Sequence, residues 1–276
     1  MILHTDSSHS WLRGLGTLLL DIDGVLHRSW VPLPGAVELP AALTRLGIRY
    51  MCVTNNATRT PDQVSKELHA IGIPIPASQI MTSALATAHE LRKRATRGTR
   101  VYTVGMRGLH EAIFGDGYFV LDTYRPEYVV VGADFELVYE KLRVACLAIR
   151  AGARFIGTNP DKTFPTEEGL IPGCGAILAA LEAATGITPE IIGKPKPALF
   201  HAALEQLGVS PEAAAMVGDR LDTDIAGGHA AGLRTIFVGT GVDTIDDARL
   251  FPSQPDLVVV DLGELIHLLQ DARAHS

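Results

Sequence analysis

The sequence predicts an α/β fold in which helices cover a parallel β-sheet. Short apolar, β-branched runs alternate with helix-length amphipathic segments along almost the whole chain. Several of these runs are apolar throughout, as expected for strands that are buried on both faces of a sheet. The 276 residues, 47% of them hydrophobic, suffice for one large domain or two modest ones with a proper core.

The same alternation places the individual elements in order. The expected strands are 17–22, 49–54, 100–104, 128–132, 154–158, 214–218, 234–239 and 256–261. The expected helices are 35–47, 61–72, 83–94, 107–114, 136–151, 174–185, 197–208, 222–232 and 262–273. Helix signals support several of them: a Thr60 cap before Pro61, and glycines after the expected last turns at Gly72, Gly186, Gly208 and Gly232.

Proline and polar residues interrupt the periodic pattern near 80–84 and again near 187–190. We therefore expect residues 1–82 and 190–276 to form one core. The segment 83–189 contains its own strands and helices, so it is expected to fold as a small inserted α/β module.

Charge and composition exclude several classes of protein. A formal net charge of −7 leaves no broad basic surface for nucleic acid. No signal peptide and no membrane-length apolar run is evident, so a soluble, cytoplasmic protein is expected. The three cysteines lack CxxC spacing and are expected to be reduced. Among them, Cys174 in the glycine-flanked PGCGA is the candidate for a reactive thiol.

Two carboxylates end the first apolar strand. Asp21 and Asp23 stand two residues apart, so an extended chain would point both in the same direction. Ligands bind at the carboxyl ends of parallel strands, and Gly24 allows a sharp turn beside them. The pair therefore suggests a ligand or metal site, with a solvated loop entry as the alternative.

Two further segments carry groups that suit an anion. Thr54 ends the run MCVT before Asn55 and Asn56, where a hydroxyl and backbone N–H groups could hold phosphate oxygens. Ordinary turn chemistry is an equal alternative there. Lys194 lies between Gly193 and Pro195, which suits a fixed positive charge, although a surface lysine before a helix is equally expected.

A third acidic group follows another apolar strand in the segment MVGDRLDTDI. Asp219 comes directly after Gly218, and Asp224 lies just beyond it. Acidic residues can cap a helix at such a place, but a carboxylate at a strand end is also what Mg²⁺ requires.

In this order the four segments resemble the motifs of the haloacid dehalogenase-like (HAD) hydrolase superfamily: DIDGV, VTNN, GKPKP and GDRLDTDI. The long insertion between the second and third is similar to the α/β cap of class II, subfamily A. That NagD-like branch includes 4-nitrophenylphosphatases, pyridoxal phosphatases, phosphoglycolate phosphatases and sugar-phosphate phosphatases. The resemblance implies a Rossmann-like three-layer parallel-sheet core with an inserted α/β cap domain of the C2 type.

The resemblance also implies roles for single residues. Asp21 would be the nucleophile that becomes an aspartyl phosphate, and Asp23 the general acid and base. Mg²⁺ would be held by Asp21, the backbone carbonyl of Asp23 and Asp219, with Asp224 orienting a bound water. The transferring oxygens would be held by Thr54, Asn55, Asn56 and Lys194. In the cap, the segment GTNPDKTFP is similar to a substrate-facing turn, with Thr158, Asn159, Asp161 and Phe164 as contacts; a polar turn packed on the cap is the alternative.

The function predicted from these residues is Mg²⁺-dependent hydrolysis of a small phosphorylated metabolite. Homodimerisation through the cap is implied only by analogy with other members. A phosphotransferase or phosphomutase of the same fold is the nearest alternative. A phosphoacceptor signalling domain and a metal-dependent protein that binds a nucleotide sugar are more distant ones. His27 stands six residues after the presumed nucleophile, and a solvated or packing role is expected for it.

Overall fold

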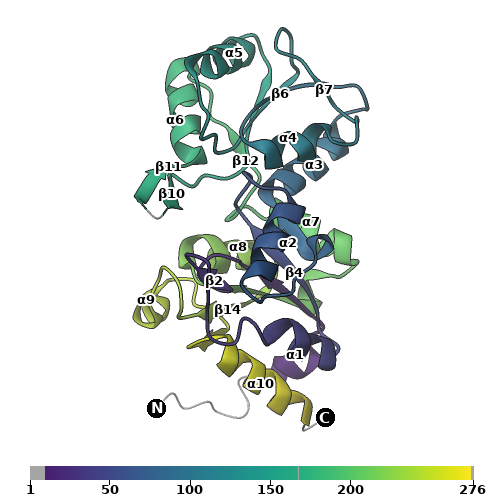
Figure 1. The fold of residues 1–276 in the computed structure, drawn as a ribbon, viewed down its shortest axis with the longest axis vertical. Helices are drawn as coiled ribbons and strands as arrows, with labels where there is room; N and C mark the ends of the chain where they lie inside the picture. The colour runs from purple at the N-terminus through teal and green to yellow at the C-terminus, as the bar shows by residue number, and fades with distance from the viewer. Residues whose placement is uncertain (1–9, 167, 275–276) are drawn as a thin grey trace. The chain divides into compact units, whose positions relative to one another are not determined.

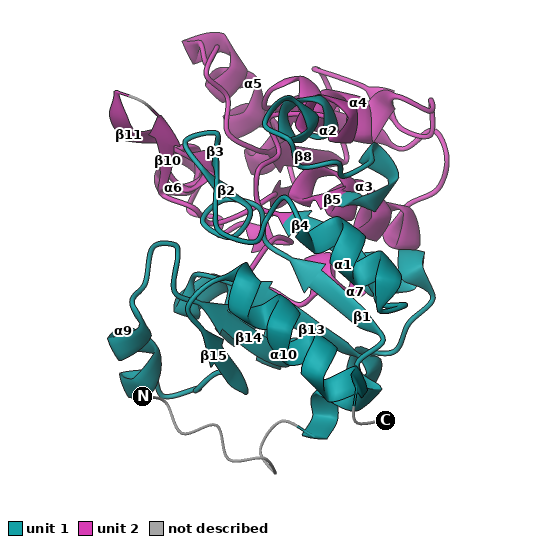
Figure 2. Ribbon diagram, turned by 60° about the horizontal axis from the view of Figure 1, so that its bottom comes forward, with its two compact units in different colours: residues 1–53, 65–80, 203–276 teal, residues 54–64, 81–202 magenta. Residues whose placement is uncertain are grey.

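The computed structural model of the protein describes residues 10–166 and 168–274 (Figure 1). The chain divides into two compact units. Unit 1 comprises residues 1–53, 65–80 and 203–276, and unit 2 comprises residues 54–64 and 81–202 (Figure 2). Each unit contains a sheet of its own. The predicted domain boundaries after residues 82 and 189 remain a prediction.

A six-stranded sheet is built from both ends of the chain. Its order is β15-β14-β13-β1-β4-β5. Strand β1 pairs in parallel with both β13 and β4, so that Leu18 lies opposite Ala215 on one side and Tyr50 on the other. The bounds are β1 Thr17–Leu20, β4 Arg49–Thr54, β5 Ile80–Thr82, β13 Ala214–Gly218, β14 Arg234–Val238 and β15 Leu257–Val259.

Helices enclose this sheet because its central strands are apolar on both faces. Every residue of β1 and β13 is buried. Helices α1 (Leu39–Arg45) and α10 (Leu262–Ala274) pack on each other, and α8 (Ala226–Ala230) packs on β14. The predicted Rossmann-like core, with a parallel sheet between helical layers, is confirmed. The remaining helices that carry residues of unit 1 are α2 Pro61–Ala70, α7 Ala198–Leu207 and α9 Ile245–Leu250.

Unit 2 contains a five-stranded parallel sheet in the order β12-β9-β8-β6-β7. Helices α5 (Tyr139–Arg150) and α6 (Cys174–Thr185) pack against it around a core that includes Val129, Phe155 and Leu178. The other elements are α3 Ser83–Arg94, α4 Arg107–Phe114, β6 Arg100–Val104, β7 Val120–Leu121, β8 Tyr128–Val131, β9 Arg154–Gly157, β12 Glu190–Ile191 and the hairpin strands β10 Thr163–Thr166 and β11 Gly169–Pro172. Unit 2 therefore has its own sheet and core.

The strongest periodic segments have the predicted bounds, among them the helices 83–94, 107–114 and 174–185. The Thr60 cap is also confirmed: its Oγ1 accepts the Gln63 N–H at 3.3 Å, and Gln63 Oε1 accepts the Thr60 N–H at 2.9 Å. Short elements were missed: β5, β7, β12, both hairpins and α9. They are too short to show a period, although Thr244 and Asp247 form a capping box at the start of α9.

Two predicted helices need correction. The helix predicted from residue 35 begins at Leu39, because Gly35 has φ +83° and its missing Cβ would lie 2.3 Å from the Gly263 nitrogen. The helix predicted over 222–232 is divided: a π-helical turn η4 covers Leu221–Ile225, and α8 follows it. Among the helices of the described residues, none combines the length and hydropathy that a membrane span requires.

Candidate active site

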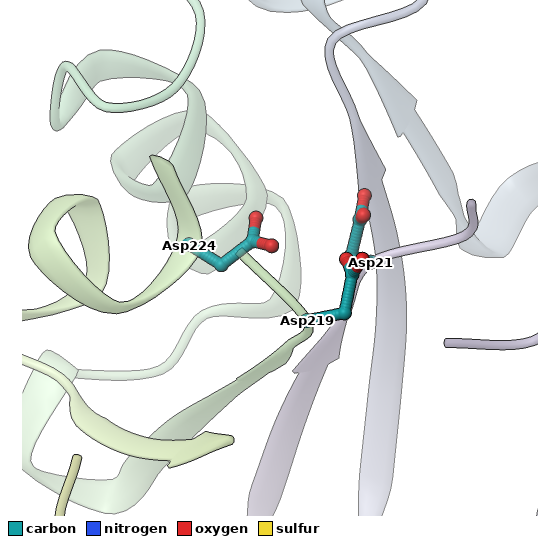
Figure 3. Close-up of side chains that lie close together, drawn as sticks. All are labelled: Asp21, Asp219 and Asp224. Carbon is teal, nitrogen blue, oxygen red and sulfur yellow. The ribbon is translucent and has the colours of Figure 1, made fainter. Parts of the chain in front are cut away.

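Three buried carboxylates meet at the carboxyl ends of two neighbouring strands. Asp21 follows β1, Asp219 follows β13, and Asp224 lies in η4. One oxygen from each lies within 4.8 Å of the others (Figure 3). Asp219 and Asp224 are fully buried, and Asp21 is 7% exposed. Because β1 and β13 are parallel neighbours, the strand ends bring Asp21 and Asp219 together, as the sequence predicted.

Backbone N–H groups hold two of these carboxylates in place. Asp219 Oδ2 accepts the Val242 N–H at 2.7 Å, and Asp224 Oδ2 accepts the Arg220 N–H at 3.1 Å. The π-helical turn around Asp224 explains the second contact, because its wider backbone lets the side chain reach back to residue 220. The resemblance implies that Asp224 orients a metal-bound water, and the structure places its carboxylate in the same cluster as Asp21 and Asp219.

Two glycines allow the backbone to approach the Asp219 carboxylate closely. A Cβ on Gly24 would lie 2.3 Å from Asp219 Oδ2, and a Cβ on Gly241 would lie 1.7 Å from the same atom. Gly24 also has φ +84°, which disfavours any other residue. The Asp219 carboxylate is therefore enclosed by backbone and has little room to change its position.

The cluster suits a hard cation. Several carboxylates that share a site without water repel one another unless a cation or a proton compensates their charge. Their oxygens are the donors that Mg²⁺ prefers, and Mg²⁺ is commonly bound by one or two carboxylates together with water and substrate oxygens. Asp21, Asp219 and Asp224 thus form a group of described residues that could hold a metal ion.

Asp23 differs from its neighbour Asp21 in exposure. Its side chain is 63% exposed, and one of its oxygens lies 3.9 Å from His27 Nε2. His27 is buried and stacks on Trp30 with ring centroids 4.6 Å apart. Both belong to the hairpin of β2 (His27–Arg28) and β3 (Val31–Pro32), whose turn residues Ser29 and Trp30 have positive φ. The packing role expected for His27 agrees with this arrangement.

A loop that the sequence did not single out supports the carboxylate cluster. Arg28 donates to the carbonyl oxygens of Thr240 at 2.5 Å and Gly241 at 2.7 Å, and Thr240 Oγ1 donates to Gly24 O at 2.7 Å. Asp243 Oδ2 accepts the Leu221 N–H at 2.7 Å. Residues 240–243 lie between elements and carry no motif, so the sequence offered no signal for them.

In unit 2, the side chain of Asn55 forms hydrogen bonds with two other predicted segments, those that contain Asp161 and Lys194. Its Oδ1 accepts the Lys194 N–H at 2.8 Å, and its Nδ2 donates to Lys194 O and to Asp161 Oδ2, both at 3.1 Å. A Cβ on Gly193 would lie 2.4 Å from Thr158 O, so only glycine fits before the lysine. The structure thus brings Asn55, Asp161 and the buried Lys194 together.

The other predicted residues of unit 2 make contacts within that unit. Thr54 Oγ1 accepts the Asn56 N–H at 3.1 Å. Thr158 is fully buried, and Asn159 donates through Nδ2 to Asn55 O at 2.7 Å. Phe164 on β10 packs edge to face on Phe135, with ring centroids 5.0 Å apart. These contacts agree with the polar-turn alternative for Thr158 and Asn159, and substrate contact by the segment remains a prediction.

Burial keeps two cysteines protonated. It raises the pKa of the Cys174 thiol to about 11, against weaker hydrogen-bonding effects from Asn159 and Thr158. Burial, followed by the nearby charge of Asp21, raises the pKa of Cys52 still further. The interpretation of Cys174 as a reactive thiol is therefore wrong, because its thiol is desolvated and the thiolate is the nucleophile. All three cysteines are free, as expected.

Comparison with known proteins identifies the family. A haloacid dehalogenase-like hydrolase family model matches residues 18–118, and a second HAD-hydrolase-like model matches residues 191–265. The acid sugar phosphatase of Staphylococcus aureus is 40% identical over 252 residues, which cover 91% of this chain and 97% of the relative.

Solved structures of phosphatases are also similar to this chain. The 4-nitrophenylphosphatase of Thermotoga maritima has a TM-score of 0.89 and 36% identity, covering 94% of this chain and 99% of that one. The glycerol phosphate phosphatase of Mycobacterium tuberculosis, in complex with magnesium, has a TM-score of 0.85 and 38% identity, covering 92% and 78%.

Fold and site together define an α/β protein that has a parallel sheet and a buried carboxylate cluster at the carboxyl ends of its strands. The chain belongs to the haloacid dehalogenase-like hydrolase family, in its NagD-like branch. Its class of enzyme is phosphoric monoester hydrolase.

Proposed function

We propose that the protein is a Mg²⁺-dependent phosphatase that hydrolyses small phosphomonoesters through an aspartyl phosphate on Asp21. The observation that carries the proposal is the cluster of Asp21, Asp219 and Asp224, with one oxygen of each within 4.8 Å of the others. The names of the relatives support a small phosphorylated substrate: an acid sugar phosphatase, a 4-nitrophenylphosphatase and a glycerol phosphate phosphatase.

The two neighbouring carboxylates suit different tasks. In the proposed first step an oxygen of Asp21 attacks phosphorus, the ester P–O bond breaks, and the leaving alkoxide takes a proton from Asp23. In the second step Asp23 accepts a proton from water as that water attacks the phosphorus of the aspartyl phosphate, which releases inorganic phosphate and restores Asp21. The exposed side chain of Asp23 is consistent with proton exchange with solvent between turnovers.

Mg²⁺ would be held by Asp21, Asp219 and Asp224, and the backbone carbonyl of Asp23 stays a predicted ligand. When bound, the ion supplies positive charge that offsets the charge of the carboxylates and of the phosphoryl group. The fixed Asp219 carboxylate supports this assignment, because a small cation with strict geometry needs ligands that do not move.

The transferring oxygens are assigned to Thr54, the N–H groups of Asn55 and Asn56, and Lys194. The hydrogen bonds of Asn55 to both backbone groups of Lys194 support this proposal, since they fix the lysine backbone. Lys194→Ala is expected to lower kcat by about 10²- to 10³-fold, the usual cost of one group that stabilises transition-state charge. Substrate choice is assigned to Asp161 and Phe164 of unit 2, and the acceptor is water.

The decisive experiment measures release of phosphate from 4-nitrophenyl phosphate, with Mg²⁺ and with the metal removed by EDTA. We expect activity only with the metal, and a loss larger than that of Lys194→Ala for Asp21→Asn. Asp246→Asn is the matched control, because Asp246 is 85% exposed and lies in α9 outside the cluster. Equal activity of Asp21→Asn and the control would overturn the mechanism.

A panel of sugar phosphates, glycerol phosphate, phosphoglycolate and pyridoxal phosphate, ranked by kcat/KM, would identify the substrate class. Phosphate transfer to an added sugar instead of water would favour the phosphotransferase alternative. Homodimerisation stays a prediction, which a solution mass near twice 29.5 kDa would support.

A further inference from the structure

A cavity of about 960 Å³ lies in unit 2, at the amino ends of its parallel strands. Arg100, Tyr128 and Arg154, the first residues of β6, β8 and β9, line one side of it. The turn that carries Asn159 and Asp161 follows the carboxyl end of β9. Because the strands run parallel, the cavity and this turn lie at opposite edges of the same sheet, so the cavity is separate from the candidate substrate contacts.

Arginine is the most frequent charged residue in the lining, although the whole chain is acidic. Five arginines line the cavity (94, 100, 125, 143 and 154), against one acidic residue, Glu127. Three of the arginines are engaged in ion pairs. Arg94 pairs with Glu190 at 2.6 Å and Arg143 with Glu140 at 2.6 Å, and Arg100 pairs with both Glu127 at 3.5 Å and Asp122 at 3.6 Å. Among the described residues, no carboxylate pairs with Arg125 or Arg154. These two guanidinium groups are therefore available to an anion.

The side chain of Arg154 is already oriented. Its guanidinium carbon lies 5.6 Å from the centre of the Tyr128 ring, and its Nη1 lies 3.4 Å from the Tyr128 hydroxyl. An arginine that stacks on an aromatic ring loses less freedom when it binds a phosphate. The rest of the lining includes apolar and aromatic side chains, of which Leu147 is 55% and Tyr124 87% exposed.

We propose that this cavity binds a nucleoside phosphate. Arg125 and Arg154 would bind the phosphate oxygens, and Leu147 with Tyr124 would contact the base. The volume lies at the upper end of the range for small-molecule sites, about 300–1,000 Å³, and exceeds what inorganic phosphate requires. An inorganic anion would be bound by the arginines alone. The apolar and aromatic part of the lining therefore favours a phosphate that carries a base.

The test is calorimetric titration of the full protein with ADP in the presence of EDTA, which suppresses turnover and metal-dependent binding. We expect binding of one ADP per chain, weakened at least about tenfold in the Arg125→Gln/Arg154→Gln double variant, which loses two charge-assisted contacts. Arg107→Gln is the control, because Arg107 is exposed on α4, pairs with Glu111 and lies outside the lining. Lys194→Ala should bind ADP like the wild type.

Each opposite result would overturn the proposal. Equal ADP affinity in the double variant and the control would show that Arg125 and Arg154 do not bind the phosphate groups. Loss of binding in Lys194→Ala would place ADP at the candidate active site instead. Pyrophosphate binding as tight as ADP binding would exclude a contribution of the base, and no binding to the wild type at millimolar ADP would exclude the site. The melting temperatures of the variants must match the wild type, because all three substituted arginines are exposed.

Discussion

Asp219 shows how close backbone can restrict a single carboxylate. Its Oδ2 accepts the Val242 N–H, and it occupies space that a side chain on Gly24 or Gly241 would fill. Fully buried and enclosed in this way, the group cannot rotate to solvent. The preorganised oxygen is what a metal with strict octahedral geometry requires.

Substitution of Gly241 by alanine should therefore weaken metal binding. The new Cβ would lie 1.7 Å from Asp219 Oδ2, so the carboxylate must move. We expect the Mg²⁺ concentration for half-maximal activity to rise by about tenfold or more, the cost typical of disturbed ligand orientation. Mn²⁺ binding followed by EPR gives a second measurement.

Gly14→Ala is the matched control, because nothing lies within 4 Å of the position of its Cβ. Unchanged metal affinity in Gly241→Ala would show that Asp219 is not a ligand.

Cys174 shows the opposite effect of enclosure, because burial there makes a reactive group inert. Its Sγ lies 3.4 Å from Val131 O and 3.7 Å from Thr158 Oγ1. Although it is the first residue of α6, where a helix N-terminus favours a thiolate, desolvation outweighs that effect and raises its pKa to about 11.

This raised pKa makes stability depend on pH with a defined sign. The unfolded chain loses the Cys174 proton above about pH 9, whereas the folded protein keeps it until about pH 11. In this window the free energy of unfolding should fall with pH, by up to about 1.4 kcal/mol per pH unit from this thiol. Urea unfolding at both ends of the window measures the slope, and Cys174→Ala should make it shallower.

The packing loss of the alanine variant is common to both pH values and cancels from the slope. An identical slope in both proteins would contradict the prediction. Cys52 should also lower the free energy of unfolding as the pH rises, because burial raises its pKa as well.

At the scale of elements, the carboxylate cluster depends on a hairpin and a loop distant in sequence. Arg28 of β2 donates to two carbonyl groups of residues 240 and 241, and the next N–H group, that of Val242, binds Asp219. Thr240 ties the same loop to Gly24. The hairpin thus positions the loop that positions the carboxylate.

Arg28→Met should accordingly loosen the loop and weaken Mg²⁺ activation by about tenfold, through the orientation of Asp219. Arg28→Lys keeps one donor and should restore part of the affinity, which a purely steric role would not explain. Arg45→Met, on the exposed surface of α1, serves as the control. If Arg28→Met lowers kcat but leaves the metal dependence unchanged, the loop acts on another step.

At the scale of the whole molecule, the two ends of the chain form one sheet. Strand β1 lies between β4 and β13, so the neighbours of Leu18 come from positions 50 and 215. The intervening segment can be long because it has its own parallel sheet and its own core around Val129 and Phe155. The carboxylates of the site therefore assemble only when the sheet of unit 1 is complete.

Metal binding should for that reason stabilise the folded protein as a whole. A ligand that binds only the native state raises the free energy of unfolding by about 2.7 kcal/mol at a ligand concentration of 100 Kd. We expect Mg²⁺ to raise the Tm of the wild type and to have a smaller effect on Asp224→Asn. Differential scanning calorimetry checks this without any substrate, and equal shifts in both proteins would place the ion elsewhere.

Periodicity alone determined most of the architecture. Periodicity predicted buried strands such as 49–54 and 214–218 and helices such as 83–94. These elements are long enough for their apolar residues to show which faces are buried. The resemblance to the HAD motifs also implied that Asp21 and Asp219 share one metal. The short hairpins, η4 and the 240–243 loop were not predictable, since their shape follows from contacts with distant residues rather than from local pattern.

The sequence by itself thus determined the α/β class and the motif residues, and its resemblance to the HAD motifs implied that Asp21 and Asp219 meet. Only the tertiary structure decided that Asp224 joins them, that Asp23 stays exposed and that Cys174 is inert. The physical reason is that burial and orientation depend on atoms from remote segments: Val131 lies against Cys174, and Val242 holds Asp219 beside Asp224. No local sequence pattern encodes those atoms.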